Sequence, residues 1–287
     1  MRPVLSELLD LLRLERIEQN IFRGQSQDLG WGAVFGGQVL GQALSAAAQT
    51  VPPDRHVHSI HGYFLRQGDA RRPIVYEVDP IRDGTSFTTR RVVAVQGGKA
   101  IFTMAASFQI LEPGFDHAAE FPTDVPGPDG LLSDLDLTLQ FADIIPEPLR
   151  KRATSDRPIE IRPVQVSNLL APLVMPPRRQ LWHRAAGRLP DDSALHCYLL
   201  AYASDFNFLT TAMQPHGVSW LTPGMQVASL DHAMWFHRPF RFDDWLLYDV
   251  DSPSASGARG LVLGRFYTRD GVLVASVAQE GLMRQRP

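Results

Sequence analysis

Residues 35–53 read FGGQVLGQALSAAAQTVPP, and this stretch decides what the chain around it can form. Its apolar residues recur at three- and four-residue intervals, which is the period of an amphipathic helix. Many of them are alanines or other small residues, so the helix can lie close against a sheet. Because the two prolines at the end cannot continue a helix, we expect the helix to stop before them.

Four segments with the composition of strands follow this helix. They are rich in β-branched and aromatic residues and span residues 57–65, 73–81, 86–96 and 100–110. Turns at Asp83-Gly84 and Gly97-Gly98 separate successive strands. One helix followed by a run of hairpin-linked strands favours an antiparallel sheet wrapped on a helix, which is an α+β fold. Ahead of them, leucines at helical spacing predict a further helix over residues 4–19.

The second half of the chain repeats this order after an interruption. Prolines and glycines crowd residues 112–130, which is typical of a linker. A short apolar helix is expected over residues 131–145, ended by Pro146 and Pro148. Beyond it we expect a helix over residues 193–214 and strands over residues 159–168, 179–186, 227–236, 245–251, 258–268 and 272–283.

Two pairs of matching residues measure the repeat. Ser59 matches Ser229 at an offset of 170 residues, and the hairpin residue Gly98 matches Gly271 at an offset of 173. A period of this length is too long for a solenoid and implies two tandem copies of one domain. Each copy alone would present a bare sheet edge, which side-by-side pairing removes. We therefore divide the chain into a first repeat (1–111), a linker with a short helix (112–157) and a second repeat (158–287).

The composition is that of a globular protein. Hydrophobic residues make up 44% of the 287 residues and charged residues 21%, and the net charge is −3. This balance argues against a nucleic-acid partner, because proteins that bind nucleic acids usually have a basic surface. Cys197 is the single cysteine, so no intrachain disulfide can form, which is typical of a reducing compartment. Without a signal-peptide pattern or a long apolar segment, we expect a cytoplasmic protein with no membrane insertion.

The motifs of several other protein classes are absent or incomplete. The serine-hydrolase motif Gly-x-Ser-x-Gly does not occur. The stretch GWGAVFG at residues 30–36 misses the dinucleotide-binding fingerprint by one position. His56, His58 and His61 lie close in sequence, but we interpret them as strand residues rather than as metal ligands. Cys197 falls on the apolar face of a predicted helix, where a free cysteine usually packs as a small hydrophobic residue.

Eight stretches of the chain carry a resemblance to a known family. They are FRGQS at 22–26, FGGQV at 35–39, HGYFLR at 61–66, RDG at 82–84, ASDFNF at 203–208, QPHG at 214–217, DHAMWFHRP at 231–239 and SASGARG at 254–260. Together they resemble acyl-CoA thioesterase II, the bacterial medium- and long-chain type with peroxisomal relatives, from about residue 5 to about residue 284. The resemblance implies a double hotdog, in which two long helices are each wrapped by a curved antiparallel sheet and the sheets are joined. It also implies an acyl-CoA substrate, no metal or redox cofactor, and homo-oligomers (dimers or tetramers).

The resemblance places the family's water-holding residues on this chain. The family's acid falls on Asp205 within ASDFN, its hydroxyl on Ser229, and its glutamine on Gln279 within VAQEG. Some members carry threonine at the hydroxyl position, and serine keeps the hydroxyl group. Asp231 and His232, close to Ser229, are supporting candidates. Spacing alone could not assemble these residues, because they fall on a predicted helix and on different strands.

Thioester hydrolysis suits these residue types. A carboxylate can take a proton from a water, while a hydroxyl and an amide can hold the same water in the right direction. All three candidates lie in the second repeat. In the first repeat, Ser59 is the matched hydroxyl, and Gln279 is matched by Gln109 at the shorter offset or Ala106 at the longer one. Because a hairpin turn fixes strand register, we favour Ala106, which leaves the chemistry to one copy.

Two other functions remain open at this point. One is a hotdog acyl-CoA hydratase or dehydratase, which would use a histidine paired with an acid. Asp231 and His232 are adjacent, however, and neighbouring strand residues face opposite ways. The other is a non-catalytic acyl-CoA-binding protein, against which the three polar residues argue. For coenzyme A itself, the candidate phosphate partners by residue type are Arg66, Arg71 and Arg72.

Overall fold

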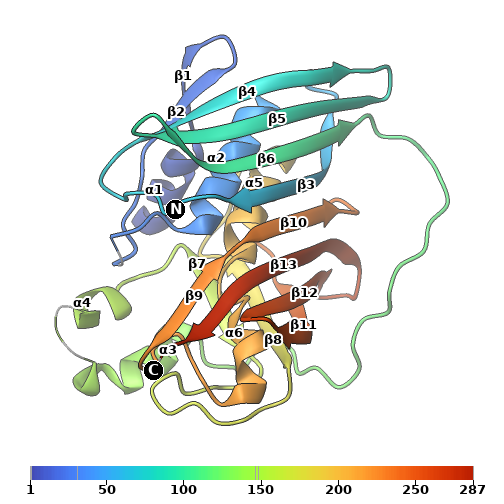
Figure 1. Cartoon of the computed structure of the whole chain (residues 1–287). Coiled ribbons are helices and arrows are strands. Elements are labelled where there is room, and N and C mark those ends of the chain that lie inside the picture. Colours follow the sequence, from blue (N-terminus) through green and yellow to red (C-terminus); the bar gives the residue numbers. More distant parts are fainter. Residues whose placement is uncertain (1, 31, 146, 148, 287) are drawn as a thin grey trace.

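Two units of helix and strands follow one another in the computed structural model, which describes residues 2–30, 32–145, 147 and 149–286 (Figure 1). The first unit contains α1 (Pro3–Leu12), β1 (Glu15–Glu18), β2 (Ile21–Gly24), α2 (Gly36–Ala48), β3 (His56–Phe64), β4 (Ile74–Asp83), β5 (Phe87–Gln96) and β6 (Lys99–Gln109). The second contains β7 (Ile159–Pro163), β8 (Arg178–Ala185), α5 (Ser193–Ser204), α6 (Thr210–Met213), η2 (Gln214–His216), β9 (Met225–Ser229), β10 (Asp231–Phe236), β11 (Leu246–Ser256), β12 (Arg259–Thr268) and β13 (Leu273–Gln285). Between them lie α3 (Asp134–Gln140), η1 (Ala142–Ile144) and α4 (Leu149–Ala153).

All strands belong to one sheet whose order is the same on both sides of its centre. Outward from the centre, one side runs β3-β6-β5-β4-β2-β1 and the other runs β10-β13-β12-β11-β8-β7, with β9 paired to β13 as well. The two central strands, β3 and β10, pair antiparallel through Ile60 and Met234. Each copy therefore covers the free edge of the other. The prediction of two tandem helix-in-antiparallel-sheet repeats is confirmed.

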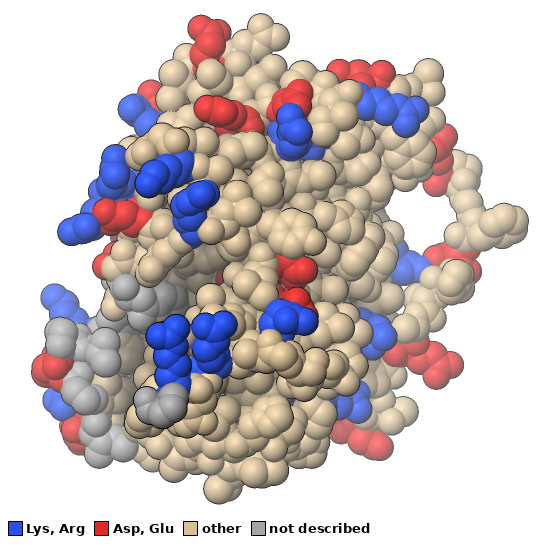
Figure 2. All heavy atoms as spheres, in the orientation of Figure 1, with Lys and Arg blue, Asp and Glu red and all other residues tan. Residues whose placement is uncertain are grey.

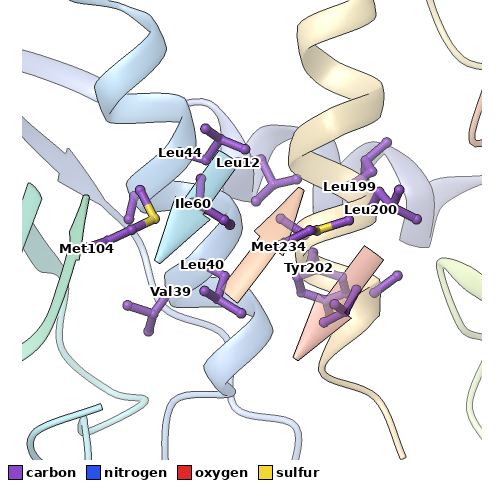
Figure 3. Packing of buried hydrophobic residues seen from close by; sticks show 14 of the residues in the cluster. Leu12, Val39, Leu40, Leu44, Ile60, Met104, Leu199, Leu200, Tyr202 and Met234 are labelled. Atoms are coloured by element: carbon purple, nitrogen blue, oxygen red, sulfur yellow. The ribbon is translucent and has the colours of Figure 1, made fainter. Parts of the chain in front are cut away.

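The helices α2 and α5 pack against each other inside the curved sheet. Eleven consecutive residues of α2, from Gly37 to Ala47, are buried. The apolar stripe predicted from the sequence covers only one side of α2, and the other side is buried against α5. A Cβ at Gly37 would stand 2.1 Å from the carbonyl oxygen of Tyr202, so glycine is required where the helices approach this closely. Figure 3 shows the side chains that meet between the helices and the central strands, among them Leu40, Leu44, Ile60, Leu199, Tyr202 and Met234.

Several predicted elements differ from the structure. The strand predicted over 159–168 ends at Pro163, and the strand predicted over 245–251 runs on to Ser256. The leading helix ends at Leu12 rather than at residue 19, and a hairpin of β1 and β2 follows, turning at Asn20 with a φ of 62°. The helix predicted over 193–214 ends at Ser204, because the chain turns through Asn207, whose φ is 59°. Asparagine adopts this left-handed conformation more readily than most residues. The strand predicted over 227–236 breaks at Leu230 into β9 and β10.

The linker lies along the outside of the second repeat. Phe121 packs edge-on against Tyr267, and the indole of Trp182 donates a hydrogen bond of 2.9 Å to the carbonyl of Pro126. Together with neighbouring apolar residues these contacts form a small second core on the outer face of the sheet. The short helix expected over 131–145 is present as α3 and η1. Pro146 and Pro148, expected to end it, lie outside the described residues.

The surface in Figure 2 mixes acidic and basic side chains across both repeats. Of the arginines proposed for coenzyme A, Arg71 forms an ion pair with Asp69, and Arg66 donates to the carbonyl of Ala100. In the part of the chain that the structure describes, no helix is both long and apolar enough to cross a membrane.

Candidate active site

Four of the five candidate residues converge where the two core helices meet the central strands. Asp205 caps the C-terminal end of α5, Ser229 is the last residue of β9, Gln279 lies in β13, and His232 lies in β10. Ser229 Oγ lies 3.5 Å from Asp205 Oδ1, and Gln279 Nε2 donates to Ser229 Oγ over 2.9 Å. Gln279 also hydrogen-bonds the Asp205 carboxylate. These residues therefore share one small polar site.

The first repeat contributes to this site through the N-terminus of α2. The backbone N–H of Gly37 donates a hydrogen bond to the Asp205 carboxylate. The N-terminal end of a helix carries unsatisfied N–H groups and partial positive charge, so it stabilises a nearby carboxylate. A Cβ at Gly36 would stand 2.6 Å from Asp205 Oδ2, so only glycine leaves room for the carboxylate in this position. The site is thus built by both repeats.

Burial controls the electrostatics of the site. Removal from water raises the pKa of Asp205, and the neighbouring His232 and the hydrogen bonds from Gln279, Gly37 and Ser229 counter part of that rise. Burial likewise lowers the pKa of His232. A carboxylate with a raised pKa is a stronger base than an ordinary aspartate. The arrangement can therefore hold a small nucleophile and accept its proton.

His232 and Asp231 face opposite ways, as strand alternation predicts. The His232 ring is fully buried, with Nδ1 2.5 Å from Gln279 Oε1 and Nε2 3.0 Å from Ser204 Oγ. Asp231 turns instead to the backbone, where its carboxylate accepts the N–H of Glu280 over 2.6 Å. This contact stabilises the break between β9 and β10. Asp231 therefore lies beside the site without belonging to the polar cluster.

The first repeat lacks the same polar groups at the equivalent positions. Both repeats carry a bulge at the same place. In β3, the two steps from Val57 to Ser59 face one step of β6, and in β9–β10 the four steps from Ser229 to Ala233 face three steps of β13. The hairpins also shift register at equivalent points, after Ala94 and after Phe266.

This register makes Val57, Ile60 and Ala106 the equivalents of Ser229, His232 and Gln279. The match of Ser59 with Ser229 at an offset of 170 is wrong, because the strand register makes Ser59 the equivalent of Asp231. The preference for Ala106 over Gln109 is confirmed by the strand pairing. The first repeat thus places apolar side chains where the second places a hydroxyl, an imidazole and an amide.

Three residues at the site, Ser204, Gly36 and Gly37, were not singled out as site residues from the sequence. Ser204 looks like an ordinary helix residue, and nothing in its spacing marks its contact with His232. The glycine pair at 36–37 did carry a signal, because consecutive glycines at a helix start often mark a close approach of the backbone. That signal indicates a close contact but not its partner, which comes from the other repeat.

The other residues considered from the sequence lie elsewhere. His58 Nε2 bonds Ser107 Oγ over 2.9 Å, away from the cluster. Cys197 packs within α5, where burial raises the pKa of its thiol to about 12. Such a thiol is rarely ionised and is a weak nucleophile at neutral pH. Within the described ranges, no group of three or more histidine, cysteine, aspartate or glutamate residues is arranged to hold a metal ion.

Comparisons with known proteins agree along the whole chain. Residues 148–282 match the family model described as acyl-CoA thioesterase, and residues 26–109 match that of the acyl-CoA thioesterase N-terminal domain. The acyl-CoA thioesterase 2 of Haemophilus influenzae is 42% identical over 284 residues, which cover 99% of each chain. The human acyl-coenzyme A thioesterase 8 is 44% identical over 285 residues, which cover 96% of this chain and 88% of that protein.

Solved structures show the same architecture. The crystal structure of an acyl-CoA thioesterase II from Mycobacterium marinum matches with a TM-score of 0.77 and 43% identity, covering 97% of this chain and 98% of that one. A hot dog fold protein from Alicyclobacillus acidocaldarius matches with the same TM-score of 0.77 at 19% identity, covering 98% and 99% of the two chains. The second likeness bears on the fold alone, and it agrees with the predicted double hotdog.

Proposed function

The chain belongs to the acyl-CoA thioesterase II family and is a thioester hydrolase, and from this premise we propose that it hydrolyses medium- and long-chain fatty acyl-CoA through one water held by Asp205, Ser229 and Gln279. The observation that carries the proposal is the hydrogen-bond chain from Gln279 through Ser229 to Asp205. It gathers a base, a hydroxyl and an amide from three separate elements around one point.

The reaction needs few groups, because a thioester carbonyl is electrophilic and its thiolate leaves readily. The water oxygen attacks the carbonyl carbon while Asp205 takes one proton from the water. The carbonyl electron pair moves onto its oxygen, and we place that oxygen at the positive N-terminal end of α2, beside Asp205, where the helix would stabilise the charge. The intermediate then re-forms the carbonyl and breaks the carbon–sulfur bond. The coenzyme A thiolate receives the proton from Asp205, so the products are a fatty acid and coenzyme A.

The alternative of a hydratase or dehydratase is less consistent with the contacts. Such an enzyme would pair a histidine with an acid at the reacting carbon. Here His232 binds Gln279 and Ser204, and Asp231 accepts a backbone N–H. Release of free thiol from an acyl-CoA distinguishes the two reactions directly. Cytoplasmic location, homo-oligomeric assembly and the coenzyme A contacts of the arginines stay predictions.

Steady-state thiol release from one acyl-CoA, with folding checked by circular dichroism, tests the mechanism. We expect Asp205→Asn to lower kcat at least about 100-fold, since general-base help is worth about 10²–10⁴-fold and an amide cannot accept the proton. Ser229→Ala and Gln279→Ala should cost less, about 1–3 kcal/mol each, because each loses one neutral hydrogen bond. Ser229→Thr should stay active because it keeps the hydroxyl.

The double variants and one control decide whether the three residues act together. Residues that serve one water are non-additive, so adding Ser229→Ala or Gln279→Ala to Asp205→Asn should change kcat little further. Ser59→Ala removes a buried strand hydroxyl from the first repeat and should leave kcat near that of the wild type. Multiplicative losses in the double variants, or near-normal activity of folded Asp205→Asn, would overturn the mechanism.

A further inference from the structure

The buried imidazole of His232 has a defined neighbour at each ring nitrogen. Nδ1 lies 2.5 Å from Gln279 Oε1, and Nε2 lies 3.0 Å from Ser204 Oγ. The ring has no exposed surface, so it does not contact bulk water. The equivalent residue of the first repeat is Ile60, which fills the same place with an apolar side chain. The histidine therefore brings polar contacts that packing alone does not require.

The contact at Nδ1 bears on the direction of the Gln279 amide. An amide carries an oxygen at one corner and an NH₂ group at the other, and the two orientations fill almost the same space. With the NH₂ toward Ser229, Gln279 donates to the Ser229 hydroxyl and the Asp205 carboxylate. In the reversed orientation, the amide oxygen would face that carboxylate and repel it. Something must hold the amide in the first orientation.

An N–H group at Nδ1 of His232 can hold the Gln279 amide in this orientation. It can donate only to the amide oxygen, so it fixes the oxygen on the histidine side and leaves the NH₂ for the site. A neutral ring with hydrogen on Nδ1 has a lone pair on Nε2, which needs a donor. The hydroxyl of Ser204, 3.0 Å away, can be that donor when its single hydrogen points to Nε2 rather than to the carbonyl of Ala201, which lies 2.9 Å from the same oxygen. Ser204 directly precedes Asp205, so this contact also ties β10 to the end of α5.

We propose that His232 is a positioning residue which, as the neutral tautomer with hydrogen on Nδ1, holds the Gln279 amide in the one orientation that can donate to Ser229 and Asp205. Ser204 sets that tautomer by donating to Nε2. The proposal rests on the proposed function, since it assigns His232 a role through Gln279 and no contact with the water. Burial, which lowers the pKa of His232, agrees with a neutral ring.

Three substitutions at one position separate this role from packing. In His232→Asn, the amide nitrogen can take the place of Nδ1 and donate to Gln279. In His232→Gln, the longer side chain places its amide near the position of Nε2 and the Ser204 contact. In His232→Leu, both hydrogen bonds are lost while most of the volume is kept. We expect kcat to fall about 10-fold or more in His232→Leu and His232→Gln, with KM little changed, and to recover to within about 3-fold in His232→Asn.

The same substitutions in the Gln279→Ala background test whether His232 affects kcat only through Gln279. If His232 acts only by holding Gln279, then His232→Leu should change kcat by less than about 2-fold once Gln279 is gone. A purely structural loss would persist in that background. His58→Leu is a control in the first repeat, because it removes a histidine that likewise bonds a serine but is only partly buried, and it should leave kcat unchanged.

A measurement on the unmodified protein does not depend on the variants folding. Nitrogen NMR of protein with ¹⁵N-labelled histidine distinguishes the two neutral tautomers, and His232→Asn assigns the signal among the nine histidines. We expect a neutral ring protonated at Nδ1. A ring protonated at Nε2 alone, equal activity of His232→Asn and His232→Leu, or an undiminished loss in the Gln279→Ala background would overturn the proposal. Failure of the proposed function would appear separately, as normal activity of Asp205→Asn.

Discussion

Gly36→Ala should displace the proposed base, the Asp205 carboxylate, without changing its chemical group. A Cβ at this position stands 2.6 Å from Asp205 Oδ2 and 3.0 Å from the ring of Phe64. Ordinary contact between such atoms begins at about 3.5 Å, so the carboxylate must move by roughly 0.9 Å. The obstructing atoms are the ends of side chains, which can shift while the backbone stays in place. The substitution should therefore displace the carboxylate within a folded protein.

The size of the effect follows from that displacement. A misplacement of about 1 Å in a reacting geometry can cost about 10²-fold, so we expect kcat to fall about 10- to 100-fold in Gly36→Ala. Stability should change little, because alanine is favoured over glycine in a helix by up to about 1 kcal/mol and this gain offsets part of the strain. Steady-state thiol release gives kcat and KM, and thermal unfolding followed by circular dichroism gives Tm.

Gly24→Ala is the matched control for this experiment. Its Cβ would stand 2.7 Å from the side-chain amide of Gln42, so it also pushes on the end of a buried polar side chain, but in the first repeat and away from the site. It should lower Tm and leave kcat near the wild-type value. A folded Gly36→Ala protein with wild-type kcat would refute the reasoning, because the carboxylate would then not need its position. An equal loss of kcat in Gly24→Ala would show that the effect is general strain.

Two further predictions follow from the raised pKa of Asp205. The base acts only when deprotonated, so kcat/KM should fall with decreasing pH at a midpoint above 3.8, the ordinary value for aspartate, and a midpoint at or below 3.8 would contradict the burial argument. A carboxyl whose pKa is higher in the folded than in the unfolded chain lowers stability as the pH rises through the folded pKa. Asp205→Asn should therefore raise Tm near neutral pH, and the gain should vanish at about pH 4 and below, near the unfolded pKa. Thermal unfolding across this pH range checks the sign.

The repeats could be predicted from the sequence because periodicity reports burial directly. The strands of the first half, β3 to β6, lie within one or two residues of their predicted bounds, since alternation and turn glycines mark both ends. The helix boundaries were less predictable. The predicted leading helix extends too far, to residue 19 instead of Leu12, because the pattern of leucines gives no stop signal before the hairpin at Asn20. The break after Ser204 follows from the turn through Asn207, and a single asparagine in an apolar helical pattern is too weak a signal to predict it.

The site was predictable only in part, and for a similar reason. The resemblance selected Asp205, Ser229 and Gln279, and these three lie within hydrogen-bond reach of one another. Matching residue types between the repeats misplaced the equivalent of Ser229, because a shared serine does not fix strand register, whereas the pairing of β3 and β9 with their neighbours makes Val57 its equivalent. The contribution of Gly37 was also out of reach, since it depends on how the two helices approach each other.

The duplication explains why one chain holds one such site. The two core helices run antiparallel, so each C-terminal end lies near the other repeat. The residue that caps this end is Asp205 in α5 and Gln49 in α2, and Gln49 bonds within its own helix to the carbonyl of Ser45. A buried carboxylate is costly unless donors surround it. The side-chain donors Ser229 and Gln279 come from the second repeat, and the first repeat has Val57 and Ala106 in their place. Its helix still provides the N-terminus that Asp205 needs, which keeps both copies necessary for the single proposed site.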